Sequence, residues 1–303
     1  MVPDFLNELM SYQESFINYL KYEKRFSSHT VVAYKNDLDQ FVLFCTKMVG
    51  EFNVLTVDTK TVRSWIVHLM ELQLSPRSVH RKVTTVKSFF KFLMKELVVE
   101  NNPAVSLPLP KIRKKLPNFV EENNLNHLLD DGFFADNFVG IRDKLIINLL
   151  YGTGIRLSEL LMLKESDFNT KEYLIRVLGK RKKERIIPYP RSINNLLELY
   201  VKERKKNVGT NADRLLVTKK GSPVYEKLIY RVVKNNLSKV TSLEKRSPHV
   251  LRHSYATHLL NKGADLNAVK ELLGHSNLAA TQVYTHTTYE KLLDSYKQAH
   301  PRG

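Results

Sequence analysis

Residues 247–260 read SPHVLRHSYATHLL, a pattern that predicts a helix with one buried side and a phosphate-binding start. Ser247 is a suitable N-cap, and Pro248 suits the first helical position. His249 and Arg252 then lie one turn apart, near backbone N–H groups that attract an anion. An apolar stripe that fits a core runs beside them: Leu251, Tyr255 and Leu259. A single histidine on a helix is more often structural, and that alternative stays open for His249.

A second cation for the same anion follows two glycines in YGTGIRLSEL, residues 151–160. The glycines allow a sharp turn that brings Arg156 to the start of the next helix. The forked guanidiniums of Arg156 and Arg252 can hold both non-bridging oxygens of one phosphate, which lysines do less rigidly. Taken alone, Arg156 would be interpreted as a surface residue.

A basic turn, GKRKKE, joins two β-rich runs at residues 173–178 and 185–189, which predicts a hairpin. Lys180 lies at the head of this turn. A lysine beside other cations has a lowered pKa, which would let it give a proton to a leaving oxygen. Lys182 and Lys183 are alternatives for that role, and simple phosphate contact is an alternative for each of them.

The stretch LGHSNLAATQVY, residues 273–284, adds a histidine and a phenol. A phenol with a pKa of about 10 is only ~0.1% ionised at pH 7, so Tyr284 needs nearby cations and a proton acceptor to attack phosphorus. His275 follows Gly274, which ends a short helix, and can orient the tyrosine or the phosphate. The set predicts cleavage of a phosphodiester by a tyrosine, with no metal and no other cofactor.

The proline-rich basic segment NNPAVSLPLPKIRKKLP, residues 101–117, predicts an interdomain linker. Before it the periodicity is almost wholly helical, which predicts an all-helical domain within residues 1–110. After it, in residues 111–303, helices accompany the hairpin, which predicts an α+β domain. We therefore expect a fold that is mainly α with a small β-hairpin or sheet. Helices are expected at residues 5–24, 30–48, 59–72, 75–97, 143–150, 158–163, 192–206, 223–240, 248–261, 266–273 and 289–299.

The formal net charge of +17 favours a polyanionic partner such as nucleic acid. Residues 1–110 hold 13 Lys and Arg against 11 Asp and Glu, whereas residues 111–303 hold 35 against 20, so the second part carries the positive field. No run reaches the roughly 18 apolar residues of a spanning helix, and no secretory signal is evident, which predicts a cytoplasmic protein without a membrane partner. Cys45, the only cysteine, is expected to be a small buried hydrophobe.

The helix expected at residues 75–97 has two contrasting sides, with Ser75 as its N-cap and Pro76 at its first position. One side is apolar: Val79, Val83, Val86, Phe90, Leu93 and Leu97. The other carries cations and hydroxyls suited to phosphates: Arg77, Arg81, Thr84, Ser88, Lys91 and Lys95. An ordinary solvent-facing side is the alternative. We expect DNA contacts from six cations: Arg77, Arg81, Lys91, Lys95, Arg181 and Lys182.

These residues, in this order, resemble the tyrosine recombinase (phage integrase) family, whose motif consists of Arg, Lys, His-x-x-Arg, His or Trp, and Tyr. The stretches TGIRLSEL, HVLRHSYATHLL, LGHSNLAATQVYTH and the final HPRG are most similar to its Xer branch. The stretch SSHTVVAYKNDLDQFVLF resembles the SAM-like core-binding domain of that family. The resemblance covers essentially the whole chain and implies a core-binding domain with linker at residues 1–110 and a catalytic domain at residues 111–303.

The resemblance implies that Tyr284 attacks the scissile phosphate, giving a 3′-phosphotyrosine and a free 5′-hydroxyl. It implies that Lys180 protonates the leaving 5′ oxygen and that Glu159 supports Arg156 from behind. The transition state would be stabilised by four side chains: Arg156, His249, Arg252 and His275. The family often has glycine after the hairpin lysine, whereas this chain has Arg181, so the turn can differ from the family pattern.

The family also implies partners. Its members clamp double-stranded DNA and assemble as four protomers, alike or unlike, on two recombination sites; residues 289–303 resemble the tail that docks into a neighbour. A second Xer-like recombinase and a DNA translocase are further partners that the family implies, in the resolution of chromosome or plasmid dimers. Two alternatives remain: a type IB topoisomerase, which reseals the same strand, and a DNA-binding protein without catalysis.

Overall fold

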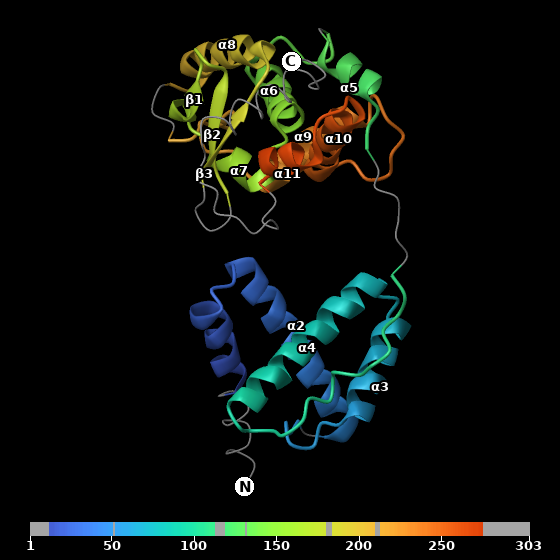
Figure 1. The fold of residues 1–303 in the computed structure, drawn as a ribbon. Coiled ribbons are helices and arrows are strands. Elements are labelled where there is room, and N and C mark those ends of the chain that lie inside the picture. The colour runs from blue at the N-terminus through green and yellow to red at the C-terminus, as the bar shows by residue number, and fades with distance from the viewer. Residues whose placement is uncertain are drawn as a thin grey trace. The chain divides into compact units, whose positions relative to one another are not determined.

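The computed structural model of the chain describes residues 12–50, 52–112, 119–130, 132–179, 184–209 and 213–274. The chain divides into two compact units, Met1–Lys115 and Leu116–Gly303, and each has a hydrophobic core of its own. Both units are rich in helix, and a small antiparallel sheet lies in the second unit (Figure 1). The predicted fold class, mainly α with a small sheet, is confirmed. Within the described ranges, no helix is both long and apolar enough to cross a membrane.

The first unit is built from capped helices. Residues 12–18 are helical and continue into a π-helical turn, η1 (Tyr19–Glu23). The longer helices follow as α2 (Ser28–Val49), α3 (Thr59–Glu71) and α4 (Pro76–Lys95). Each begins at a residue whose side chain accepts a hydrogen bond from a backbone N–H of the first turn: Ser27, Asp58 and Ser75. The predicted helices of this unit are therefore confirmed wherever the structure describes them.

Aromatic side chains fill the core of the first unit. Phe41 packs edge-on against Trp65, with ring centroids 4.8 Å apart, and both are almost fully buried. Cys45 is 2% exposed, as predicted, and burial raises the pKa of its thiol to about 12. The prediction for Leu97 is wrong: it is 92% exposed, because α4 ends at Lys95 and Leu97 adopts a left-handed conformation with φ 58°.

The first part of the predicted linker is attached to the first unit. The Asn102 side chain donates to the carbonyl of Lys87 at 2.9 Å, and His80 Nε2 lies 2.9 Å from the carbonyl oxygen of Pro110. Leu107 and Leu109 pack against the same core. Residues 101–110 therefore form a strap along α4 of the first unit.

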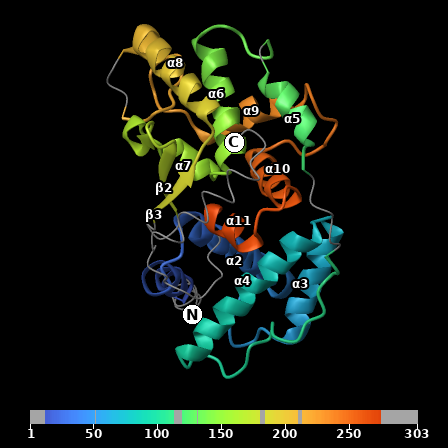
Figure 2. The same cartoon turned by 45° about the horizontal axis from the view of Figure 1, so that its top comes forward.

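The second unit surrounds one central helix, α6 (Phe138–Thr153), which is apolar on nearly all sides and almost wholly buried. It packs against α8 (Arg191–Val208) and α10 (Pro248–Asn261), and runs between them in both views (Figures 1 and 2). Shorter helices complete the unit: α5 (Glu122–Leu129), α7 (Leu157–Met162), η2 (Glu165–Asp167), α9 (Glu226–Leu237) and α11 (Leu266–Leu272). Of these, α5 was not predicted, because eight residues show too little periodicity.

The sheet of the second unit confirms the predicted hairpin and adds a short strand. Its order is β1 (Phe168–Asn169), β2 (Leu174–Leu178) and β3 (Glu184–Pro188), all antiparallel. In the register of β2 and β3, Ile175 faces Ile187 and Val177 faces Arg185, and all four residues are buried. One face of the hairpin thus covers the core and brings a buried arginine to its edge.

Candidate active site

Helix α10 begins at the predicted residue, but the predicted side-chain cap hydrogen bond is not formed. Pro248 occupies the first turn and Ser247 is the N-cap residue, yet the Ser247 side chain accepts no cap hydrogen bond. Its buried Oγ has no partner among the described residues. His249 is exposed, whereas Arg252, one turn later, is 9% exposed. The helix start therefore presents the imidazole to solvent and the guanidinium to the interior.

Arg252 is held by two backbone carbonyls from distant parts of the chain. Its Nη1 donates to Gly154 O at 2.5 Å, and its Nη2 donates to Leu273 O at 2.6 Å. Burial, followed by the charges of Arg156 and Arg185, lowers the pKa of Arg252 to about 10. This guanidinium is still protonated at neutral pH, so the site keeps a buried positive charge.

Arg156 begins α7, as the glycine pattern predicts. Gly154 ends α6 with φ 60°, and a Cβ there would lie 2.4 Å from the ring of Tyr255, so only glycine fits this turn. Arg156 Nη1 donates to Glu159 Oε1 at 2.9 Å, and Nη2 donates to Gly274 O at 2.7 Å. Its side chain remains 25% exposed, so it can still reach a ligand.

Glu159 lies beneath Arg156, where the resemblance implied a supporting carboxylate. It is 4% exposed and also accepts the backbone N–H of Arg156 at 2.8 Å. Burial raises the pKa of Glu159, but hydrogen bonds from Arg185 and Arg156 outweigh burial, and the net pKa is lowered. The carboxylate is therefore ionised at neutral pH and can hold more than one cation.

Arg185 is the residue of this cluster that sequence reasoning missed. It lies on β3, is 7% exposed, and donates from Nη1 and Nη2 to both oxygens of Glu159 at 2.7 and 2.8 Å. Its Nε donates to Leu272 O at 2.9 Å. A signal was available: in the predicted strand at residues 185–189, alternation places Arg185 on the same side as Ile187. A cation on the inward face of a strand indicates a buried partner.

Three arginines thus meet the end of α11. The carbonyls of three consecutive residues, Leu272, Leu273 and Gly274, accept from Arg185, Arg252 and Arg156 in that order. These carbonyls lie at the end of a helix, where partners are missing and positive charge is favourable. We call this set of three guanidiniums and three carbonyls, together with Glu159, the arginine cluster.

The structure brings together only part of the predicted site. Arg156, Glu159 and Arg252 belong to the arginine cluster, and His249 lies at the start of the helix that carries Arg252. Of the other predicted residues of the second unit, five lie outside the described residues: Lys180, Arg181, Lys182, His275 and Tyr284.

On the predicted DNA-binding side of α4, some cations form ion pairs within the first unit and others do not. Arg77 and Lys91 are exposed and form no ion pair with a described residue. Arg81, in contrast, pairs with Asp37 of α2. Lys95 lies 3.2 Å from Glu23 of η1, and its ammonium lies over the ring of Tyr19. The sequence pattern considered only acids on α4 itself, whereas these carboxylates come from neighbouring elements.

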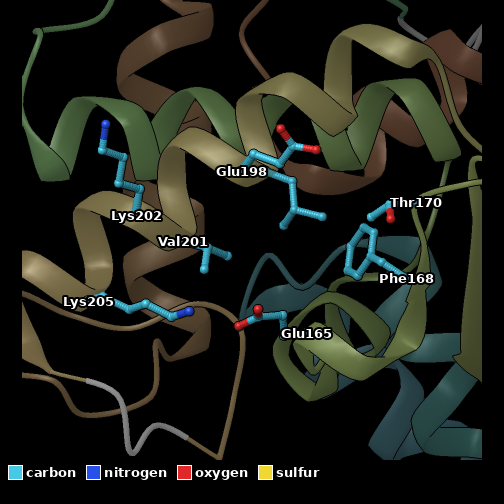
Figure 3. A pocket seen from close by; sticks show the side chains of 8 residues that line it. Glu165, Phe168, Thr170, Glu198, Val201, Lys202 and Lys205 are labelled. Carbon is cyan, nitrogen blue, oxygen red and sulfur yellow. The ribbon is translucent and has the colours of Figure 1, made fainter.

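A pocket in the second unit contains none of the predicted site residues (Figure 3). Its apolar floor includes Phe168 and Val201, and Glu165 of η2 and Lys202 and Lys205 of α8 lie around it. Glu165 is already bound, because it accepts from Arg204 at 2.8 Å.

Comparison with known proteins finds relatives along nearly the whole chain. Residues 118–291 match the phage integrase family, and residues 14–97 match the N-terminal SAM-like domain of phage integrases. The tyrosine recombinase XerC of Staphylococcus saprophyticus is 39% identical over 291 residues, covering 96% of this chain and 97% of that protein. The tyrosine recombinase XerC of Bacillus subtilis is 34% identical over 302 residues, covering 98% of this chain and 99% of that protein.

The fold is also similar to that of solved recombinases. The structure of the XerH site-specific recombinase bound to difH substrate, a pre-cleavage complex, superposes with a TM-score of 0.70 at 22% identity, covering 97% of each chain. The corresponding post-cleavage complex gives a TM-score of 0.71 at 23% identity, covering 94% of each chain. From the two family matches and the relatives together, this chain belongs to the phage integrase family, as a tyrosine recombinase of the Xer type.

Proposed function

We propose that this tyrosine recombinase resolves chromosome or plasmid dimers at a specific DNA site and so serves chromosome partition before cell division. The observation that supports this is the arginine cluster, which holds Arg156 and Arg252 around one short stretch of chain. Two forked guanidiniums suit the two non-bridging oxygens of a phosphodiester. Because Glu159 stays ionised beneath Arg156, the cluster balances part of this charge before DNA arrives.

In the proposed reaction, the Tyr284 oxygen bonds to phosphorus as the bond to the 5′ oxygen breaks. The phenol proton passes to an acceptor in the site, and Lys180 gives a proton to the leaving 5′ oxygen. The developing negative charge would be stabilised by Arg156, His249, Arg252 and His275. The phosphotyrosine keeps the bond energy, so the 5′-hydroxyl of the partner strand can reseal the DNA without ATP.

We assign residues 1–110 to a core-binding domain with its linker and residues 111–303 to the catalytic domain. DNA phosphates would be bound by Arg77, Arg81, Lys91, Lys95, Arg181 and Lys182. Four protomers would assemble on two recombination sites in the cytoplasm, with residues 289–303 docking into a neighbour. A second Xer-like recombinase and a DNA translocase are the further proposed partners.

A nicked duplex tests the proposed chemistry. The binding site is first selected from genomic DNA, and a nick is then placed beside the cleavage position so that the 5′-hydroxyl product diffuses away. The full-length protein is expected to form a covalent adduct, and Tyr284→Phe is expected to form none. A catalytically silent DNA-binding protein would bind this duplex without an adduct, which would overturn the proposal.

A plasmid with two sites separates recombination from topoisomerase activity. A recombinase exchanges strands between the sites and gives products of new connectivity. A type IB topoisomerase reseals the same strand and gives relaxed plasmid only. Relaxed plasmid without exchanged products would replace the recombinase assignment by the topoisomerase one.

A further inference from the structure

Arg185 stands out because all three of its donor groups bind described residues of its own unit. Its three donor atoms Nε, Nη1 and Nη2 bind the Leu272 carbonyl and the two oxygens of Glu159, and only 7% of the residue is exposed. Such charge-assisted bonds are short and directional. A guanidinium in this state has little surface left for DNA, so any role in the reaction must act through the residues that it binds.

The first route runs through Glu159. This carboxylate binds the backbone N–H and the Nη1 of Arg156, and it accepts from Arg185 on the same two oxygens. Without Arg185, this carboxylate, which is 4% exposed, would keep Arg156 as its only ion-pair partner among the described residues. Because the bonds from Arg185 help to hold the pKa of Glu159 low, their loss would raise that pKa and loosen Arg156.

The second route runs through the end of α11. The Leu272 carbonyl that binds Arg185 is followed by the Leu273 and Gly274 carbonyls, which bind Arg252 and Arg156. A Cβ on Gly274 would lie 3.2 Å from Nη1 of Arg185, so the backbone there packs directly on this guanidinium. Arg185 therefore contacts Glu159, the carboxylate that orients Arg156. It also contacts the end of α11, whose carbonyls bind Arg156 and Arg252.

We infer that Arg185 is a positioning residue for DNA strand cleavage: it fixes Arg156 through Glu159 and fixes the end of α11 through the Leu272 carbonyl. In this role it acts through Glu159 and the Leu272 carbonyl rather than on the phosphate itself. The inference rests on the proposed roles of Arg156 and Tyr284. It links the β2–β3 hairpin to the arginine cluster, since β3 carries Arg185 into it.

The test compares Arg185→Lys and Arg185→Met with a matched control, Arg204→Lys. Arg204 is 3% exposed in the same unit and binds Leu215 O at 2.9 Å and Glu165 at 2.8 Å, outside the arginine cluster. For each protein one measures melting temperature, affinity for the selected duplex, and single-turnover adduct formation on the nicked duplex at saturating protein. Both Arg185 variants are expected to bind DNA as the parent does but to cleave about 100-fold more slowly, because a misplaced group costs that order of rate.

Arg204→Lys is expected to lower the melting temperature but to keep the parent cleavage rate. The pH profile adds a readout that a general loss of stability does not give. In Arg185→Met the raised pKa of Glu159 should make cleavage fall as the pH is lowered, over a range in which the parent rate is constant. In combination, Glu159→Gln and Arg185→Met should cost less than the sum of the two single changes, because both remove the contact between Arg185 and Glu159; what Arg185→Met adds to Glu159→Gln measures the contact with the Leu272 carbonyl.

Parent-like cleavage by both Arg185 variants would overturn the inference. So would an equal loss in Arg204→Lys, because the effect would then follow stability rather than position. If the unchanged protein forms no adduct on the nicked duplex, the proposed function fails, and that result is distinct from either of these.

Discussion

In the part of each unit that the structure describes, a buried carboxylate binds two cations, and the two clusters differ in what else those cations bind. In the first unit Asp37 of α2 binds Arg81 and Lys82 of α4. In the second unit Glu159 binds Arg156 and Arg185. A buried ion pair adds little stability by itself, because desolvation opposes attraction. The comparison therefore concerns what each cluster positions rather than how strongly it binds.

The Asp37 cluster joins two helices of one unit and leaves one cation at the surface. The Lys82 side chain is 6% exposed, and the Arg81 side chain is 47% exposed. In the Glu159 cluster, both cations also donate to backbone carbonyls at the end of α11. Arg156 donates to the Gly274 carbonyl, and Arg185 donates to the Leu272 carbonyl. The Asp37 cluster fixes α2 against α4 and leaves the charge of Arg81 near the surface. The Glu159 cluster connects β3, the start of α7 and the end of α11.

The largest expected effect is that of Glu159→Gln. This change leaves Arg185 buried without its counter-charge, and breaking a buried pair typically costs about 3–5 kcal/mol. The free energy of unfolding, measured by denaturant titration, should fall by this order, and adduct formation at saturating protein should slow as well. A Glu159→Gln protein with parent cleavage would show that the second cluster is only structural.

Asp37→Asn should have a smaller effect. Lys82 keeps a hydrogen bond to Gln40, and Arg81 can turn toward solvent, so we expect a loss of about 1.5–3 kcal/mol, the range for a hydrogen bond to a charged group. The cleavage rate at saturating protein should not change. If it falls as it does in Glu159→Gln, the contrast between the two clusters is lost.

Acid should remove the contribution of the Glu159 cluster to stability. The pKa of Glu159 is lowered in the folded state from a usual value of 4.5, so its contribution to stability is complete above that value and is lost as the pH falls through the folded pKa. Unfolding free energies measured between neutral pH and acid should show this loss below about 4.5 in the parent protein. In Glu159→Gln the part due to this group should be missing; an unchanged pH dependence would remove Glu159 as its source.

The smallest effect concerns two lysines of α4. Lys91 has no ion pair with a described residue, whereas Lys95 pairs with Glu23. Each phosphate contact contributes about 0.9 to the slope of log affinity against log salt concentration. Lys91→Ala should reduce that slope by this amount, and Lys95→Ala should reduce it less, because its charge is already partly balanced. Equal slopes for the two variants would show that the pairing with Glu23 does not persist on DNA.

The sequence predicted what depends on local pattern. The spacing of apolar residues predicted α2, α3, α4 and α10, because burial of one helix side repeats along the chain. The glycine turn before Arg156 was also local and is confirmed. The arginine cluster could not be predicted from local pattern. Glu159 of α7 and Leu272 of α11 contact Arg185 of β3 only when these three elements are packed together.

Two expectations drawn from local pattern concern contacts that the pattern does not contain. Ser247 has the sequence of a cap, but the chain around it buries its hydroxyl without using it. No acid on α4 itself interrupts its cationic side, but Asp37 and Glu23, which are far away in sequence, pair with Arg81 and Lys95. Contacts between elements set both outcomes, and a pattern within one element does not contain them.

The strap formed by residues 101–110 has a consequence for how the two units act together. His80 contacts the Pro110 carbonyl at one end, and at the other end the Val120 N–H donates to Ser254 Oγ at 2.9 Å, so nine residues, 111–119, connect the anchored points. Such a tether spans roughly 35 Å at most. If both units bind DNA as proposed, binding of one raises the effective concentration of the other to the millimolar range that short linkers provide. Release of the strap would lengthen the tether and lower that effective concentration, so the contacts of His80 and Asn102 limit the length of chain that is free between the units.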